Sequence, residues 1–190
     1  AMNKLFFPLL FAGSLMAAPV LAAQQVDMSK SEIRFSAKQM NVAAEGRFRK
    51  FVAKVNFDPA NLAQSSVSVD VDIASIDIGS RENETELKSR AWFNASAFPQ
   101  ARFSASQFKA KGNNQYEASG KLSIKGISRD ITFPFSLQQS GTQQIVSGSV
   151  PLKRLAFNVG EGAWSDTETV ADDVTVKFRL TLQPQTATSK

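Results

Sequence analysis

The feature that most constrains this fold is a period-two alternation of apolar and polar side chains, which recurs between residues 33 and 182. Val67, Val69 and Val71, for example, are separated by serine and aspartate. Successive side chains of a β-strand point to opposite faces of the sheet, so this pattern predicts strands with one dry and one wet face. The expected strands, about eight in number, are 33–38, 51–57, 66–73, 102–109, 116–124, 131–137, 145–153 and 174–182.

Glycine and asparagine in short motifs, at 111–114, 125–126 and 140–141, predict tight turns between several of these strands. An antiparallel set of about eight strands either stacks as two sheets or closes into a barrel, whose interior is filled by side chains or holds one slender ligand. We expect a single all-β domain with its dry face inward. An outer-membrane barrel would face its apolar side to lipid, but one tyrosine and two tryptophans cannot form two aromatic girdles.

One helical segment interrupts the strands at Ser80–Phe93. Ser80 can cap the helix, and Glu84 and Glu86 each lie four residues before a basic residue, a spacing that stabilises helices. Leu87, with Ala91 and Trp92, gives the segment an apolar stripe. We expect it near the barrel mouth, where it is either a lid or a plug that closes the end.

The N-terminus predicts a cleavable signal peptide at residues 1–23. Lys4 precedes an apolar stretch that reaches Leu21 without another charge, and small residues at 17–23 fit a signal-peptidase site. A membrane anchor is the competing interpretation, but the stretch contains Pro8 and Pro19 and has no basic stop-transfer cluster after it. We therefore expect residues 24–190 to fold as one domain outside the cytoplasm.

The sequence contains no cysteine and no histidine. Disulfides and thiol nucleophiles are thereby excluded, as are the commonest general base and the commonest metal ligand. The net charge of +5 is modest, and the basic residues are spread along the strands, which does not favour nucleic-acid binding. No phosphate loop, nucleophile elbow or metal-ligand spacing is present, so we expect neither an enzyme nor a metal site.

A series of short blocks resembles the YceI-like, polyisoprenoid-binding family, in the family's order and across the whole expected domain. The resemblance implies an extended lipocalin-like barrel whose bore takes a long isoprenoid or fatty chain, in proteins that are usually periplasmic and are not known as enzymes. Many relatives carry a histidine in the early strands, and its role cannot be transferred to this chain. The blocks are KQMNV at 38–42, EGRFRKF at 45–51, VNFDP at 55–59, ASIDIG at 74–79, LKSRAWF at 87–93, FPQARF at 98–103, GKLSIKG at 120–126, RLAFNVGEG at 154–162, AWSDT at 163–167 and VADDV at 170–174.

The fifteen phenylalanines suit a dry bore, because this side chain has no hydroxyl that needs a partner. A barrel core filled by side chains would show the same alternation, and only the resemblance favours a ligand. We expect the residues that line the ligand site to be Met40, Phe48, Phe51, Val71, Ile73, Leu87, Trp92, Phe93, Phe135, Phe157 and Trp164.

Arg47 and Arg49 flank Phe48 in a basic stretch and are the candidates for contact with a ligand headgroup. The alternative is that this stretch is an ordinary solvated face. Acidic residues between 161 and 173 lack the ligand spacing of a calcium loop and the fixed carboxylate pair of a glycosidase.

The expected function is that of a periplasmic protein that carries or stores a polyisoprenoid, an isoprenoid quinone or a fatty-acid-like lipid, without a cofactor. The alternative is a structural or stress-response barrel without a ligand, which docks on a membrane or a redox partner. The sequence leaves open whether the chain is a monomer or a homodimer.

Overall fold

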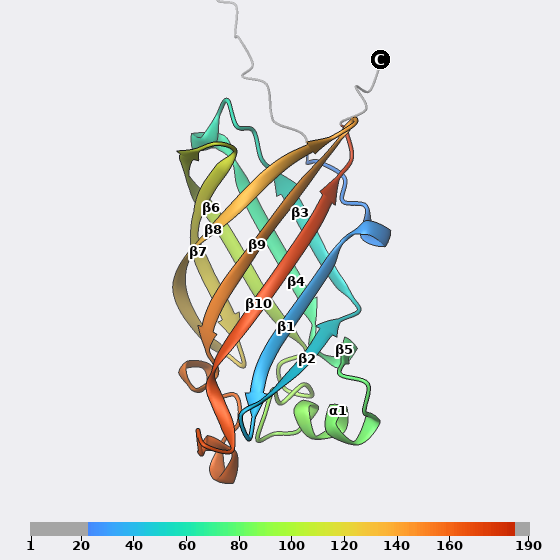
Figure 1. The fold of residues 1–190 in the computed structure, drawn as a ribbon, viewed down its shortest axis with the longest axis vertical. Coiled ribbons are helices and arrows are strands. Elements are labelled where there is room, and N and C mark those ends of the chain that lie inside the picture. Colours follow the sequence, from blue (N-terminus) through green and yellow to red (C-terminus); the bar gives the residue numbers. More distant parts are fainter. Residues whose placement is uncertain (1–22, 185–190) are drawn as a thin grey trace, which may run out of the picture.

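A computed structural model describes residues 23–184, which form a tall, curled, antiparallel sheet with one short α-helix at its lower end (Figure 1). The all-β class and the single antiparallel sheet are thus confirmed. The expected signal peptide lies outside the described residues except for Ala23. The strands are β1 Glu32–Gln39, β2 Val42–Phe48, β3 Phe51–Asn56, β4 Ser66–Asp72, β5 Ile76–Asp77, β6 Gln100–Gly112, β7 Gln115–Ile124, β8 Ile127–Ser140, β9 Gln143–Lys153 and β10 Val170–Leu182.

The ten strands follow the order β3-β4-β6-β7-β8-β9-β10-β1-β2-β5. Most neighbours are joined by hairpins, but β1 pairs with the last strand, so that Glu32 lies opposite Arg179. The first and last strands therefore lie side by side within the sheet.

The two outer parts of the sheet are connected by one bent stretch of chain. β2 pairs with β1, and β3 pairs with β4, although only Arg49 and Lys50 separate the two strands. At the end of β3 that is farther from this bend, Gln24 forms a bridge to Val55, and Val26 forms one to Leu182 of β10. The curled sheet is thus drawn together along its length by the β2–β3 bend and by residues 24–26.

The structure has two strands more than the eight expected. β2 was missed because its sequence, VAAEGRF, does not alternate between apolar and polar residues. β5 was missed because it has only two residues and takes its place by pairing with the end of β2.

Tight turns connect the long hairpins as the glycine and asparagine motifs predict. Asn113 and Asn114 between β6 and β7, and Lys125 and Gly126 between β7 and β8, all have positive φ values. Two consecutive residues with φ above zero form the turn whose twist matches that of a two-stranded ribbon. These motifs therefore set the register of the hairpins.

The helix α1 comprises Arg81–Lys88 and is shorter than the segment expected from sequence. Ser80 caps it, as predicted, by accepting a hydrogen bond from the Asn83 N–H. Beyond Lys88 the chain continues in turns to residue 97. The remaining helical elements are 3₁₀ turns: η1 Met28–Lys30, η2 Leu62–Gln64, η3 Ile73–Ser75, η4 Arg154–Phe157 and η5 Gly162–Ser165. Within residues 23–184 no helix has the length and hydropathy that crossing a bilayer requires.

Candidate functional site: an apolar cavity within the barrel

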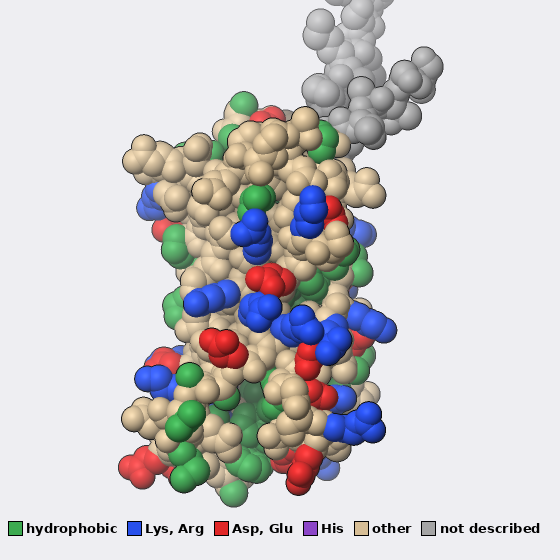
Figure 2. Space-filling model, turned by 45° about the vertical axis from the view of Figure 1, so that its right-hand side comes forward, with side chains coloured by type: hydrophobic (Ala, Val, Ile, Leu, Met, Phe, Trp, Pro, Cys, Tyr) green, Lys and Arg blue, Asp and Glu red, His purple; other side chains and the backbone are tan. Residues whose placement is uncertain are grey.

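The curled sheet encloses a cavity of about 280 Å³ with an apolar wall. In Figure 2 a recess with hydrophobic side chains is visible at the lower end of the molecule, the end that carries α1 in Figure 1. The structure thus contains an apolar space inside the sheet, not a barrel filled completely by side chains.

The wall is built from the apolar side of the alternating strands. Val67, Val69 and Val71 of β4 contribute to it, as do Val176 and Phe178 of β10. The dry face therefore points inward, and the polar residues between these positions face solvent.

Aromatic rings fill the barrel at the end opposite α1. The ring of Phe57 makes edge contacts with those of Phe108, Tyr116 and Phe135, at centroid distances of 5.3, 5.1 and 5.4 Å. Tyr116 and Phe135 also stack on each other. Such edge-to-face contacts are favourable packing for aromatic rings, and we refer to these four residues as the aromatic plug.

The chain around α1 forms the wall at the other end. Leu87, Trp92 and Phe93 line the cavity, and Phe93 makes an edge contact with Phe48 of β2. Hydrogen bonds tie this chain to the segment after β9, because the Ala91 carbonyl accepts from the N–H groups of Gly160 and Glu161. The region after β5 therefore belongs to the cavity wall.

Arg154, at the start of η4, is a buried cation at this end, with only 5% of its surface exposed. Its Nε and Nη atoms donate five hydrogen bonds, all to backbone carbonyl groups, at 2.7–3.3 Å. Burial lowers the pKa of the guanidinium, and the charge of Asp172 opposes this shift. Because a guanidinium has five N–H donors, every donor is used. The accepting carbonyls are those of Val159, Gly160, Trp164, Val170 and Ala171.

Gly160 is required by this arrangement. It has a φ of +90°, and a Cβ there would lie 2.3 Å from Arg154 Nη1. We call Arg154 with its five carbonyls the arginine cage. The cage fixes the loop between β9 and β10 as part of the end wall.

The structure brings most of the predicted lining residues together. Those that line the cavity are Phe48, Val71, Ile73, Leu87, Trp92, Phe93, Phe135 and Phe157.

Three predicted lining residues lie elsewhere. Met40 occupies the β1–β2 turn with a positive φ and is 74% exposed, because the alternation ends where the hairpin turns. Phe51 is buried in the main hydrophobic cluster but does not reach the cavity. Trp164 packs behind Trp92, with ring centroids 5.4 Å apart, and its Nε1 donates to Glu86.

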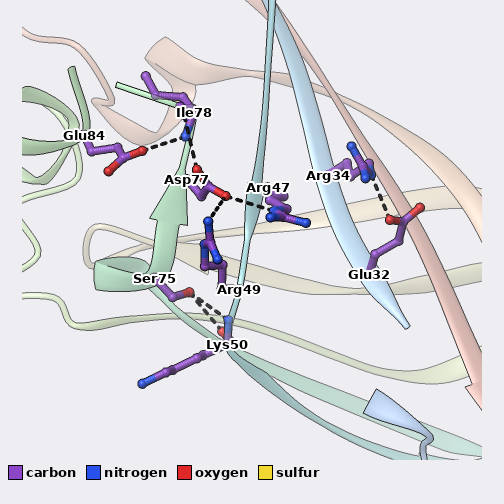
Figure 3. A network of polar contacts seen from close by, with 10 residues as sticks. Glu32, Arg34, Arg47, Arg49, Lys50, Ser75, Asp77, Ile78 and Glu84 are labelled. Carbon is purple, nitrogen blue, oxygen red and sulfur yellow. Dashed lines mark hydrogen bonds and ion pairs between the residues drawn. The ribbon is translucent and has the colours of Figure 1, made fainter. Parts of the chain in front are cut away.

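The two headgroup candidates, Arg47 and Arg49, lie outside the cavity. Both bind the carboxylate of Asp77 on β5, at 2.9 and 2.7 Å (Figure 3). The hydrogen bond from Arg47 is the main cause that lowers the pKa of Asp77. Because Phe48 points inward at the end of β2, the residues on either side of it point outward. Next to Asp77, the Ile78 N–H donates to Glu84 and so joins the end of β5 to α1 (Figure 3).

Sequence reasoning missed Arg154, and no local pattern identifies it, since its partners lie 5 to 17 residues away and are backbone atoms. It also left out several aromatic wall residues, such as Phe103, Phe133 and Phe178. The alternation places these three on the dry face, so that signal was present in the sequence.

The acidic residues between 161 and 173 make ordinary polar contacts, since Glu161 pairs with Lys125 and Asp173 with Lys153. Asp166 accepts hydrogen bonds from the Glu168 N–H and the Thr169 hydroxyl, which lower its pKa, the hydroxyl contributing most. Across residues 23–184 no group of three or more acidic side chains is placed to hold a metal ion.

Comparison with known proteins gives both sequence and structural matches. A UPF0312 protein of Vibrio cholerae serotype O1 is 38% identical over 87 residues, which is 46% of this chain and 46% of that protein. The crystal structure of Burkholderia cenocepacia BcnA is similar with a TM-score of 0.80 and 44% identity, covering 83% of this chain and 99% of BcnA. A polyisoprenoid binding domain from Saccharophagus degradans has the same fold, with a TM-score of 0.68, 16% identity, and coverage of 87% and 99%.

The family model of the YceI-like domain matches residues 24–182. This range begins at the residue that bridges to β3 and ends with the last residue of β10, so it includes every strand of the curled sheet. The chain belongs to the YceI-like family.

Proposed function

We propose that this protein is a periplasmic binding protein that holds one long apolar molecule, a polyisoprenoid, an isoprenoid quinone or a fatty chain, in the cavity of its barrel. The observation that carries the proposal is the space within the curled sheet, with its apolar wall. The N-terminal charge and apolar pattern of residues 1–23 supports export. The S. degradans domain, which is described as polyisoprenoid binding, supports this ligand class.

The wall explains how such a ligand would bind. Burial of each methylene group contributes about 0.8 kcal/mol, so affinity for the tail should rise with chain length until the cavity is filled. An apolar surface of this kind recognises length and thickness far better than chemical detail. We therefore expect several ligands with similar tails to compete for the same space.

The wall also favours binding over catalysis. Two charged residues border the cavity: Arg102, whose exposed guanidinium pairs with Asp70, and Arg154, whose donors are all used. A general acid or base must reach the proton that it transfers, and neither guanidinium offers such a group. We propose transport or storage of the ligand without chemical change.

Extraction of the gently purified protein with organic solvent, followed by mass spectrometry, tests this function. We expect a stoichiometric lipid, and we expect added isoprenoids to raise the Tm of delipidated protein, because a ligand that binds only the folded state stabilises it. If no lipid is present and no isoprenoid shifts the Tm, the proposal is wrong.

A matched pair of variants on β8 sharpens the test. Ile131 lines the cavity, whereas Thr132 faces solvent. Ile131→Trp should fill the space and abolish the ligand-induced rise in Tm, while Thr132→Trp should leave it intact. Equal rises in both variants would show that the ligand binds outside the cavity.

A further inference from the structure

Trp92 carries a hydrogen-bond donor without a partner in the wall of the cavity. The residue is only 7% exposed, and its Nε1 is buried with no acceptor. Three buried side-chain polar atoms lack a partner among residues 23–184, and of these only Trp92 Nε1 belongs to a residue that lines the cavity. Burial of an unpaired N–H is unfavourable, and native proteins rarely leave one without a reason.

The second tryptophan provides a direct contrast. Trp164 packs against Trp92, but its Nε1 donates to Glu86 Oε1 at 3.1 Å. The indole of Trp164, outside the cavity, thus donates to an acceptor of the protein. The adjacent indole of Trp92, in the cavity wall, has no acceptor.

The charge of Arg154 makes the same part of the wall electropositive. Its guanidinium carbon lies 5.5 Å from the centroid of the Trp92 ring. Among residues 23–184 no carboxylate forms an ion pair with it, and the charge of Asp172 acts on it without direct contact. A positive charge in an apolar environment acts over a longer range than one in water. The electronegative end of a bound molecule is therefore favoured here over the opposite end, which is closed by the aromatic plug.

We propose that the apolar ligand carries a neutral oxygen, a hydroxyl or carbonyl group, at its α1 end, and that this oxygen accepts a hydrogen bond from Trp92 Nε1. The inference rests on the proposed function and adds the orientation and one chemical requirement of the ligand. Nε1 is covered in this structure, so the oxygen reaches it only when the wall around Trp92 moves. A neutral group fits because Arg154 has no N–H left for a carboxylate or phosphate.

The indole N–H signals of ¹⁵N-labelled protein report this contact directly, because the chain has only two tryptophans. Delipidated protein is titrated with hexadecane, 1-hexadecanol, 2-hexadecanone and hexadecanoate. We expect the alcohol and the ketone to move the Trp92 indole proton downfield and hexadecane to leave it nearly unchanged, with the Trp164 signal as the internal control. Spectra of Trp92→Phe and Trp164→Phe assign the two signals.

Affinities for the same probes separate the contribution of the Trp92 hydrogen bond from that of the apolar contacts of its ring. Trp92→Phe keeps an aromatic wall but removes the donor, so we expect it to weaken binding of the alcohol and the ketone by about three- to tenfold. Binding of hexadecane should change by less than twofold. Trp164→Phe is the matched control, and we expect no selective loss for the oxygen-bearing probes.

The outcomes distinguish this inference from the proposed function. One outcome is that wild-type protein binds hexadecane and 1-hexadecanol while neither the Trp92 signal nor the affinities of Trp92→Phe discriminate between them. In that case the proposed hydrogen bond is wrong and the carrier function stands. If hexadecanoate binds more tightly than both neutral oxygen probes, the neutral group is wrong. If no probe binds to delipidated wild-type protein, both proposals fail. If Trp92→Phe does not fold, the wild-type titration decides alone.

Discussion

The two ends of the barrel are closed by different means. At the end opposite α1, the aromatic plug joins rings from β6, β7 and β8 to Phe57. At the α1 end, turns and 3₁₀ segments form the wall, and backbone hydrogen bonds to Arg154 and Ala91 hold them. The ring packing is shared among several side chains, whereas the arginine cage depends on one side chain at the centre of five carbonyls.

This difference indicates a division of roles within one fold. The aromatic plug resembles an ordinary protein core, whose contribution is stability. The α1 end carries the unpaired Trp92 donor and the buried charge of Arg154, both of which are costly in a core. Costly polar groups are typical of the part of a protein that meets a ligand.

Removal of the Arg154 side chain from the arginine cage should lower the stability of the protein most. Arg154→Ala leaves five carbonyls without their donor, so we expect the free energy of unfolding to fall by roughly 4–5 kcal/mol. Urea unfolding measures the loss. Arg129→Ala is the control, since exposed Arg129 donates to a single carbonyl, that of Ala156, and should cost less than about 1 kcal/mol. Equal losses in the two variants would show that the cage is no stronger than a surface contact.

Truncation of one aromatic ring at each end should destabilise the protein to different extents. Phe57→Ala removes the centre of the aromatic plug, and we expect a loss of about 3–4 kcal/mol. Phe93→Ala removes a half-buried ring with a single aromatic partner and should cost about 1–2 kcal/mol. Because Phe57 also borders the cavity, its removal should shift ligand preference towards longer chains. Equal losses, measured by urea unfolding, would contradict the division of roles.

The smallest expected effect concerns Asp77, on the outside of the α1 end. Its folded-state pKa is depressed, chiefly by the hydrogen bond from Arg47, so its contribution to stability is present above its ordinary pKa. That contribution should be lost as the pH falls below about 4, where the carboxylate takes up a proton. Urea midpoints between neutral pH and pH 3 should fall less steeply for Asp77→Asn than for the wild type. Parallel curves would exclude Asp77 as a source of acid sensitivity.

The alternation predicted the long strands and the inward direction of their apolar faces, because a half-buried sheet imposes its period on the sequence. It could not predict β2 and β5, which exist because neighbouring strands pair with them and not because of their own residues. Phe135, on an alternating strand, was expected in the wall and lies there. Phe48 also lies in the wall, but its strand does not alternate, and Met40 was placed there although a turn reverses the chain at that position.

The candidate site was predictable where it is built from strands and unpredictable where it is built from loops. Trp92 was identified from the segment after α1, but neither its unpaired Nε1 nor the contact with Arg154 leaves a local signal. Arginine binding to distant backbone carbonyls places no demand on the identity of those residues, except that Gly160 must lack a Cβ. Such information exists only in three dimensions.

The pairing of the first strand with the last has a consequence for how this protein is made. Glu32 pairs with Arg179, so β1 cannot take its final place until the chain as far as β10 is free to fold. Contacts so distant along the chain form slowly. During that interval the apolar faces that will enclose the cavity are open to water and to other chains. The length of this wait sets how long the newborn polypeptide needs protection from aggregation.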